Sequence, residues 1–341
     1  MKKTLYLFIA ILSLVTLSAC SKSDSKTSTT DDPAKQEASS QNSESKTADT
    51  ADIDLADAKL AAFVKCINDH SNTILDTYSR YQEWADEAEG PSVDKDPYGF
   101  INLYNDPQTC VDGIKAAKAL KPSYPELEKA GDDYATALST LAPLMSEAFD
   151  YYDQENYKDD AMAKGKEMHP KLTAGFKAFD AADAALRTEL DAIQNKLDEK
   201  RLETIEKSEG KAYGYWSTSI MILADKLVDE GNVADLNEVK IESFQKGLDE
   251  FENSMDQLST YHKAHGQELM TTVQFDSFLD QSKEFLKAAK DLMRRARDKT
   301  PYTDFEQSQI GTASEWMVEG SPGKMIQEYN NLVSRSNSLM Y

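Results

Sequence analysis

The sequence predicts an all-α protein of long helices packed as bundles, carried on a disordered, lipid-anchored N-terminal tether. Apolar residues recur at steps of three and four through most of the chain, which is typical of helices that bury one face. No proline occurs between Pro170 and Pro301, and glycine makes up only 14 of the 341 residues. We find no convincing run of alternating apolar and polar residues between turn signals, so strands are not predicted.

Residues 1–19 resemble a bacterial lipoprotein signal peptide. Two lysines precede the apolar stretch Leu5–Thr16, which is too short to cross a bilayer as a stable helix. Then follows Leu17-Ser18-Ala19-Cys20, a lipobox pattern in which the cysteine is lipidated and becomes the new N-terminus. We therefore expect Cys20 to anchor the protein to a membrane through its acyl chains. The alternative is an ordinary signal peptide that contains a cysteine.

The residues after the lipobox indicate where the protein resides. Ser21, in place of aspartate, resembles the outer-membrane sorting signal of Gram-negative lipoproteins. We expect a location in the bacterial cell envelope, on the outer membrane facing the periplasm. In a Gram-positive source the same signal would mean the outer face of the plasma membrane. Residues 20–52 contain almost no apolar side chain. They are expected to form a disordered linker with a reach of roughly 30 Å.

Residues 53–341 are expected to form the folded body, and its first half contains four predicted helices. Helix 53–88 carries an apolar seam and ends before a Gly-Pro pair, and helix 107–119 lies between two Pro-containing turn signals. Helices 124–156 and 159–207 carry two further seams, and Pro170 in the second should kink or briefly break it. The three seams are Leu60, Phe63, Ile67, Ile74, Tyr81 and Trp84; Leu127, Tyr134, Leu138, Leu141, Met145, Ala148 and Tyr152; and Leu172, Phe176, Phe179, Leu186, Leu190, Ile193 and Leu197.

The second half is predicted to contain helices 211–230, 235–265, 273–298 and 323–339, separated by Gly- and Pro-containing turn signals. The polar stretch 203–214, which carries two glycines, either divides the body into two helical halves or lies within one connecting helix. The helix 235–265 has a seam with steps of 3, 4, 3, 4 and 3, as in a coiled coil. That seam consists of Ile241, Phe244, Leu248, Phe251, Met255 and Leu258.

Composition and charge narrow the class of protein. The chain has 60 acidic residues against 38 lysines and arginines, a formal net charge of −22. Removal of residues 1–19 takes away two lysines and no acid, so the mature chain carries −22 − 2 = −24. Nucleic acid is excluded as a partner, because phosphate binding needs a basic surface. With 40% hydrophobic and 29% charged residues, the chain is neither a polytopic membrane protein nor wholly disordered.

Two cysteines remain after Cys20, and both belong to the folded body. Cys66 and Cys110 would be exported to a compartment that oxidises thiols, which favours one disulfide between them. The bond would staple the first long helix to helix 107–119, with a structural role worth roughly 4 kcal/mol. Two free thiols or a metal-binding pair are the alternatives.

The four histidines fall on extensions of the helical seams. His262, His265 and Glu268 follow one another at steps of three, and imidazole and carboxylate at helical spacing can converge on a metal. His70 or His169 could complete such a set. The pattern is neither His-Glu-x-x-His nor Glu-x-x-His, so packing of the histidines in the bundle is the favoured interpretation. No cofactor is predicted; a metal ion or haem is the alternative, followed by a pH-sensing role.

One predicted helix, 273–298, is rich in basic residues although the chain as a whole is acidic. Its basic residues repeat at steps of 4, 3, 4 and 3 and form a stripe opposite an apolar face, with Arg295 and Lys299 nearby. Pairing with acidic helices of the same chain is the favoured interpretation. The alternative is an anion site for a lipid headgroup, a lipopolysaccharide phosphate or an acidic partner. This basic stripe consists of Lys283, Lys287, Lys290, Arg294 and Arg297.

A set of residues between 149 and 179 resembles a known signature. It runs Phe149-Asp150-Tyr151-Tyr152, Glu155-Asn156-Tyr157-Lys158-Asp159-Asp160, Gly165-Lys166-Glu167-Met168-His169-Pro170 and Phe176-x-x-Phe179. The order is similar to the centre of the YiiG-like bacterial lipoproteins, and the likeness extends from about residue 55 onward. The resemblance implies a helical domain of unknown function and an envelope location. It implies no ligand and no catalytic residue, and the signature itself could serve packing.

No catalytic signature accompanies these features. The chain lacks a Gly-x-Ser-x-Gly elbow, a Walker A loop, a Rossmann glycine pattern and a Cys-x-x-Cys pair, so an enzyme is not predicted. The favoured hypothesis is a non-catalytic envelope lipoprotein, a tethered helical module that binds or scaffolds an unknown envelope protein or small ligand. The alternatives are a periplasmic metal- or haem-binding protein that uses the seam histidines and a sensor of anions or envelope lipids that uses the basic stripe.

Overall fold

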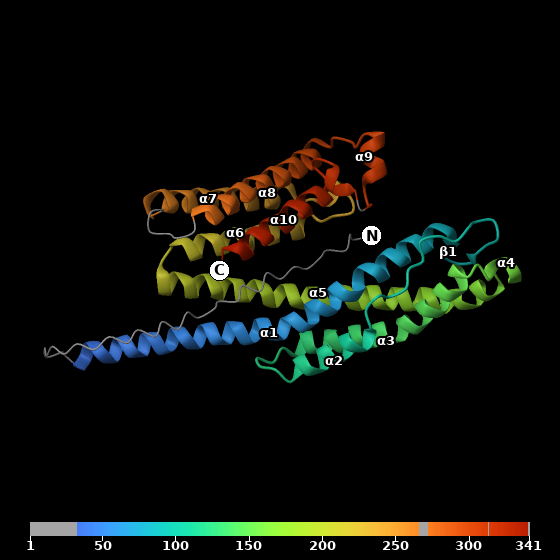
Figure 1. The fold of residues 1–341 in the computed structure, drawn as a ribbon, viewed down its shortest axis with the longest axis horizontal. Coiled ribbons are helices and arrows are strands. Elements are labelled where there is room, and N and C mark those ends of the chain that lie inside the picture. Colours follow the sequence, from blue (N-terminus) through green and yellow to red (C-terminus); the bar gives the residue numbers. More distant parts are fainter. Residues whose placement is uncertain (1–32, 266–271, 313, 340–341) are drawn as a thin grey trace. The chain divides into compact units, whose positions relative to one another are not determined.

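The computed structural model describes residues 33–265, 272–312 and 314–339 (Figure 1). Within these ranges the protein consists of α-helices, two short 3-10 turns and one pair of two-residue strands. The predicted all-α fold class is therefore confirmed. The described part of the chain contains no helix long and apolar enough to cross a membrane.

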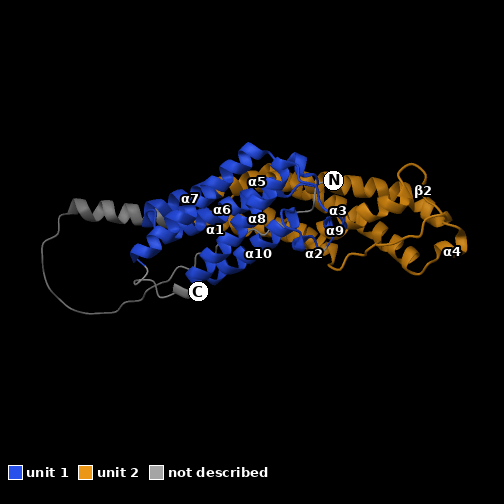
Figure 2. Ribbon diagram, turned by 90° about the horizontal axis from the view of Figure 1, so that it is seen from above, with its two compact units in different colours: residues 1–5, 12–50, 198–341 blue, residues 6–11, 51–197 orange. Residues whose placement is uncertain are grey.

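The chain divides into two compact units, shown in two colours in Figure 2. We follow the order of the chain and call residues 51–197, orange in Figure 2 and labelled unit 2 there, the first unit. The second unit consists of residues 198–341, which group with the start of the first helix up to Thr50 and are blue in Figure 2, labelled unit 1. The boundary falls inside one long helix, a few residues before the polar stretch 203–214. Each unit buries its own apolar side chains and is described separately.

The first unit is built from four main helices, a small hairpin and one helical turn. Its elements are α1 (Pro33–Trp84), β1 (Ala85–Asp86), β2 (Gly90–Pro91), α2 (Pro107–Lys118), α3 (Pro125–Asp153), α4 (Tyr157–Asp160) and α5 (Ala163–Glu209). The three predicted seams on α1, α3 and α5 supply most of its core, and nearly all of their residues are buried. Helical periodicity alone places these side chains on one face, and burial of that face stabilises the unit.

A buried polar network ties the three long helices of the first unit together. The Ser71 hydroxyl of α1 donates to Asp183 Oδ1 of α5 at 2.6 Å and lies 2.9 Å from the Tyr134 hydroxyl of α3. Arg187 Nε donates to the other carboxylate oxygen of Asp183 at 2.8 Å. Such groups are tolerated inside a core because they satisfy one another. The network holds the helices in register, and its buried groups are not exposed to solvent.

The ends of α1 differ from the prediction. The helix begins at Pro33, inside the segment expected to be a linker, and ends at Trp84 instead of residue 88. At the other end the chain turns into the hairpin of β1 and β2, where Ala85 pairs with Pro91. The Asp86 carboxylate holds this turn by accepting the N–H groups of Ala88 and Glu89, both at 2.9 Å.

The predicted helix 159–207 is interrupted near its start and not at its proline. Ala161 and Met162 have φ angles of 54° and 68°, so the chain reverses between α4 and α5. Burial of the Met162 side chain, which is 1% exposed, offsets the strain of this left-handed turn. The helix α5 then continues through Pro170 without the predicted break.

The second unit is a bundle in which α6, α7, α8 and α10 pack side by side (Figure 1). Its core is rich in phenylalanine, including Phe244, Phe251, Phe278 and Phe285, each fully buried. Two regions differ from the predicted elements: a 3-10 turn precedes α7, and the segment between α8 and α10 is partly helical. The elements are α6 (Tyr213–Gly231), η1 (Leu236–Glu238), α7 (Ile241–His265), α8 (Thr272–Asp298), α9 (Asp304–Gln309), η2 (Glu315–Met317) and α10 (Pro322–Ser338).

Candidate functional site

The histidines of the proposed metal set lie at the end of α7 and face different surroundings. The His262 ring stacks on Phe275 of α8 with ring centroids 3.9 Å apart, and its Nε2 lies 3.8 Å from Asp276 Oδ1. The His265 ring is exposed and stacks on Tyr261 of its own helix at 4.3 Å. Glu268 lies outside the described residues. Within the described ranges no group of three or more His, Cys, Asp or Glu side chains could hold a metal ion.

The other two histidines, His70 and His169, are both buried in the first unit, and their surroundings differ. His70 is 1% exposed, and neither ring nitrogen has a hydrogen-bond partner among the described residues. His169 accepts at Nδ1 from the Tyr81 hydroxyl at 2.8 Å, while its Nε2 donates to the Glu87 carbonyl at 3.0 Å. His169 therefore holds the hairpin. Glycine is required at position 90, because a Cβ on that residue would lie only 3.0 Å from Cγ of His169.

The signature around His169 forms an aromatic cluster at one end of the first unit. Tyr81 packs edge-on against Trp84 with ring centroids 4.8 Å apart, and Trp84 packs edge-on against Tyr152 at 5.0 Å. The Tyr151 hydroxyl donates to Asp160 Oδ1 at 2.6 Å and closes the turn that follows α3. These contacts account for the tyrosines, the acid and the histidine of the signature by packing.

The basic stripe on α8 is largely paired with acids. Lys290 Nζ lies 2.7 Å from Glu252 of α7, and Lys283, Arg294 and Arg297 pair with acids on α8 itself. Lys287 is exposed, and the described residues provide it with no ion pair within 4 Å. Most stripe residues also remain open to solvent; the side chain of Lys283, for example, is 63% exposed. The structure therefore places these residues on an open helix face rather than in a pocket.

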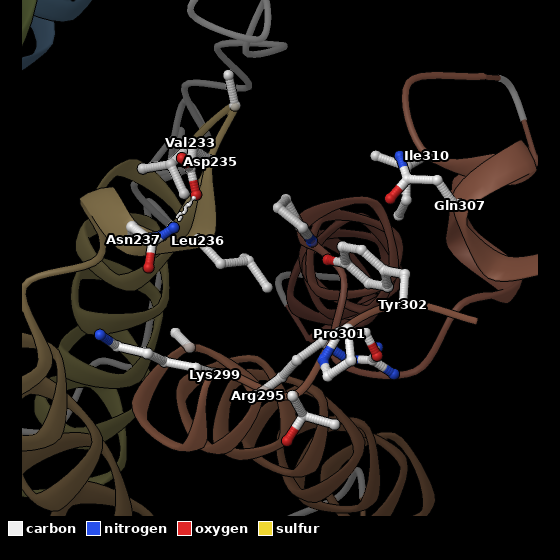
Figure 3. Close-up of a pocket in the computed structure, with 14 residues that line it drawn as sticks. Val233, Asp235, Leu236, Asn237, Arg295, Lys299, Pro301, Tyr302, Gln307 and Ile310 are labelled. Carbon is white, nitrogen blue, oxygen red and sulfur yellow. Dashed lines mark hydrogen bonds between the residues drawn. The ribbon is translucent and has the colours of Figure 1, made fainter. Parts of the chain in front are cut away.

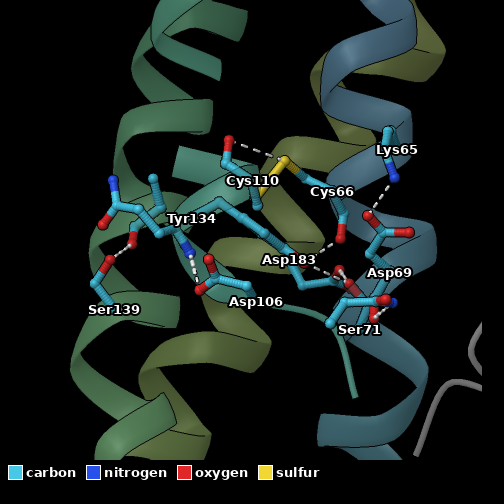
Figure 4. The surroundings of a disulfide bond; sticks show 12 residues. Lys65, Cys66, Asp69, Ser71, Asp106, Cys110, Tyr134, Ser139 and Asp183 are labelled. Atoms are coloured by element: carbon cyan, nitrogen blue, oxygen red, sulfur yellow. Dashed lines mark hydrogen bonds and ion pairs between the residues drawn. A yellow bond between two sulfur atoms is a disulfide. The ribbon is translucent and has the colours of Figure 1, made fainter. Parts of the chain in front are cut away.

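The predicted disulfide between Cys66 and Cys110 is confirmed (Figure 4). Their Cα atoms are 5.0 Å apart, and both residues are buried. The bond joins α1 to α2 beside the network of Ser71, Tyr134 and Asp183. Tyr134 also donates to the Cys66 carbonyl at 3.1 Å, so the bond is embedded in the core rather than poised for exchange.

A pocket of about 430 Å³ lies in the second unit (Figure 3). One side is the connection between α6 and α7, residues 233–237, and another is the connection from α8 to α9, residues 299–302. The last turn of α8 supplies Arg295 and Ala296, α9 supplies Gln307, and the start of α10 contributes Pro322. Small-molecule sites in proteins have this size, and the lining here combines apolar with polar side chains.

Arg295 organises the wall of the pocket. Its guanidinium lies 4.4 Å from the centre of the Tyr302 ring and donates to the carbonyls of Pro301 and Glu319 and to Glu306 Oε1, at 3.2, 2.9 and 3.0 Å. Five fixed donors suit arginine to this task, because one side chain can join several loop segments. The backbone N–H of Thr303 also donates to Glu306, as part of a capping box that starts α9.

A second buried group fixes the rest of the loop segment. Glu315 is 6% exposed, and its carboxylate accepts the N–H groups of Gly311 at 2.9 Å and Gly323 at 3.1 Å. Ser321 donates to the Glu315 carbonyl and caps α10 by accepting the N–H of Lys324. These hydrogen bonds tie the described parts of the connection between α8 and α10 to the start of α10.

Sequence analysis missed this pocket, although it noted Arg295 and Lys299 near the basic stripe. The lining residues are spread along the chain from Val233 to Pro322, so no short motif contains them. One signal was present: more than twenty residues join the two predicted helices 273–298 and 323–339. Connections of that length in a compact protein commonly carry function.

These observations define a class: a helical protein with a disulfide in its first unit, two compact units and a pocket in the second. The chain belongs to the family described as protein of unknown function (DUF3829), which matches residues 54–338. It is 31% identical to the "Uncharacterized protein YiiG" of Escherichia coli (strain K12) over 285 residues, which cover 82% of this chain and 78% of that protein. No solved structure matches the chain.

Proposed function

We propose that this protein is a lipoprotein of the bacterial cell envelope whose helical body binds a small ligand without catalysing a reaction. The observation that carries the proposal is the lipobox Leu17-Ser18-Ala19-Cys20 behind an apolar signal stretch. The disulfide between Cys66 and Cys110 supports it, because stable disulfides belong to oxidising compartments outside the cytoplasm. The pocket at the end of α8 supports the binding role, since its size suits a small molecule and Arg295 joins several of its wall segments.

Lipidation of Cys20 is tested by labelling growing Escherichia coli cells with radioactive palmitate. We expect the full-length protein to incorporate label and the Cys20→Ser variant to incorporate none. A Cys66→Ser/Cys110→Ser variant is the matched control, because it removes the other two cysteines and should label as the unaltered protein does. Label that persists in Cys20→Ser, or no label in any variant, would overturn the anchor.

The outer-membrane address is tested by density-gradient separation of the two membranes from the same cells. We expect the protein to sediment with the outer membrane and the Ser21→Asp variant to shift to the inner membrane. A Ser21→Thr variant should remain with the outer membrane. The same distribution for Ser21→Asp and the unaltered protein would contradict the proposed sorting signal.

A further inference from the structure

We propose that the pocket at the end of α8 binds a small organic anion with an apolar body, and that Lys299 holds its anionic group. This inference deepens the proposed binding function by naming the ligand class. It does not depend on the lipid anchor, so palmitate labelling and the ligand titration described below fail independently.

The apolar body is accommodated by the walls. Apolar side chains from several separate parts of the second unit lie among the polar residues that line the pocket. Burial of apolar ligand surface against these side chains supplies non-directional affinity. The main apolar lining residues are Val233, Leu236, Ala296, Pro301, Ile310 and Pro322.

The charges on the lining favour an anion. Arg295 is committed to Glu306 and to two carbonyls. Asp235 lies on the opposite side, where its Oδ1 accepts both the backbone N–H and the side-chain amide of Asn237 and so caps η1. Lys299 is exposed and forms no ion pair with any described residue. Lys299 is thus the lining cation that remains available to a ligand.

The backbone keeps Lys299 at the pocket. Its φ angle is 52°, and the following N–H of Thr300 donates to the Arg295 carbonyl at 3.0 Å, which ends α8 and turns the chain into the pocket wall. A left-handed lysine is strained relative to glycine or asparagine at the same place. Its use in a chain with 60 acids and only 38 lysines and arginines is explained by a role for the ammonium group.

The lining also contains a neutral donor. Tyr302 lines the pocket, and burial raises the pKa of its hydroxyl to about 12. The hydroxyl therefore remains protonated at neutral pH and can donate a hydrogen bond to a bound oxyanion. A hydrogen bond to a charged group is worth roughly 1.5–3 kcal/mol, which gives a cation and a hydroxyl together useful selectivity for an anionic ligand.

The test uses two dyes that differ only in one anionic group. 8-Anilinonaphthalene-1-sulfonate is an aromatic sulfonate, and N-phenyl-1-naphthylamine is its neutral counterpart; both fluoresce more strongly in apolar sites. Each is titrated into the whole mature-length chain from residue 20, exported with Cys20→Ser so that no lipid or detergent is present. We expect the sulfonate to bind tightly with one site per chain and the neutral dye to bind more weakly.

Three variants assign the site. Lys299→Asn removes the charge, and asparagine suits the left-handed backbone. We expect this variant to bind the sulfonate about tenfold or more weakly and to bind the neutral dye with unchanged affinity. Ala234→Trp, at an exposed lining position, should fill the pocket and abolish binding of both dyes. Lys287→Gln, which removes a charge from the same helix outside the pocket, should alter neither. Sulfonate binding that survives both Lys299→Asn and Ala234→Trp would overturn the proposal.

Displacement then distinguishes the two common kinds of biological anion. Octanoate and octyl phosphate share an alkyl body and differ in the head group, and each is added to the dye complex. Displacement by either supports the anion site and identifies its head group as carboxylate or phosphate. Octylammonium is the control and should displace nothing. Displacement by octylammonium as effective as that by both anions would contradict an anion site.

Discussion

At the scale of single residues, His70 is the most unusual group of the first unit. It is 1% exposed, and both ring nitrogens lack hydrogen-bond partners among the described residues. Burial lowers the pKa of its imidazole below the ordinary value of 6.5, because a cation would have to form away from water. The nearby carboxylates of Asp69 and Asp106 partly oppose this effect, and Lys65 adds to it. The ring is thus a neutral core side chain that resists protonation.

We expect this histidine to make the protein less stable in mild acid. Below pH 6.5 the unfolded chain takes up a proton that the folded protein does not, so the free energy of unfolding falls as pH decreases from 6.5 to the lowered pKa. The slope is at most about 1.4 kcal/mol per pH unit. Urea unfolding from pH 8 to pH 5 should show this loss in the unaltered protein, and a smaller one in His70→Leu.

The exposed His265 provides the matched control. A His265→Gln variant should retain the full pH dependence, because its ring lies in solvent in the folded protein as well. Parallel pH profiles for the unaltered protein and His70→Leu would show that His70 does not control acid stability.

At the scale of elements, one buried ion pair joins two helices of the first unit. Lys59 of α1 is completely buried, and its ammonium contacts the carboxylate of Glu128 in α3 and donates to the Leu120 carbonyl at 3.1 Å. The hydrogen bond from Lys59 holds the pKa of Glu128 below its usual range. Glu128 also accepts the N–H of Tyr124 at 3.1 Å, which places the carboxylate at the start of α3. The pair thus fixes where the two helices meet.

Loss of this carboxylate charge should destabilise the protein strongly. Glu128→Gln keeps the side-chain shape but leaves the Lys59 charge buried without a counterion, and we expect a loss of roughly 3 kcal/mol in unfolding free energy. The neighbouring pair Lys129–Asp133 is 72% and 56% exposed, so Asp133→Asn should change stability by less than about 0.5 kcal/mol. Chemical denaturation at pH 7 measures both. Similar losses in the two variants would mean that burial does not distinguish the pairs.

At the scale of the whole molecule, the division into two units separates two sources of stability. The disulfide closes a loop within the first unit, with 44 positions between its cysteines, and the second unit relies on its phenylalanine-rich core. Two helices, α1 and α5, are continuous across the boundary between the units. Loss of the disulfide should therefore act on one unit.

We expect a Cys66→Ser/Cys110→Ser variant to lose up to about 4 kcal/mol of stability in the first unit. Hydrogen exchange followed by mass spectrometry should show faster exchange in peptides from residues 51–197 and unchanged exchange in peptides from residues 213–265. Reduction of the unaltered protein by a thiol should reproduce the pattern. Equal acceleration in both ranges would show that the two units unfold as one.

Local periodicity accounts for the parts of this architecture that sequence analysis anticipated. The seam residues Phe63, Leu138 and Phe244 are fully buried because steps of three and four place them on one helix face whatever the neighbouring helix is. The hairpin after Trp84 was missed, because strands of two residues show no periodicity. The reversal at Ala161 was missed as well, since alanine rarely adopts a left-handed conformation.

The candidate sites also differ in how far the sequence could predict them. Cys66 and Cys110 could be paired from the sequence because the body contains only two cysteines. His262 and His265 were grouped by their spacing, yet α8 covers only the face that carries His262. The pocket could not be assembled from the sequence, because Asp235 and Lys299 line one pocket only when α6, α8 and their connections are packed.

The sequence by itself determined the helical class, the positions of the main helices, the buried seams and the disulfide. Each of these depends on local spacing or on the number of residues of one type, and such information lies along the chain. The tertiary structure alone decided the boundary within α5, the isolation of His70, the depth of Lys59 and the pocket beside Lys299. These depend on which surfaces meet, and side chains from distant segments acquire a shared environment only after the helices have packed.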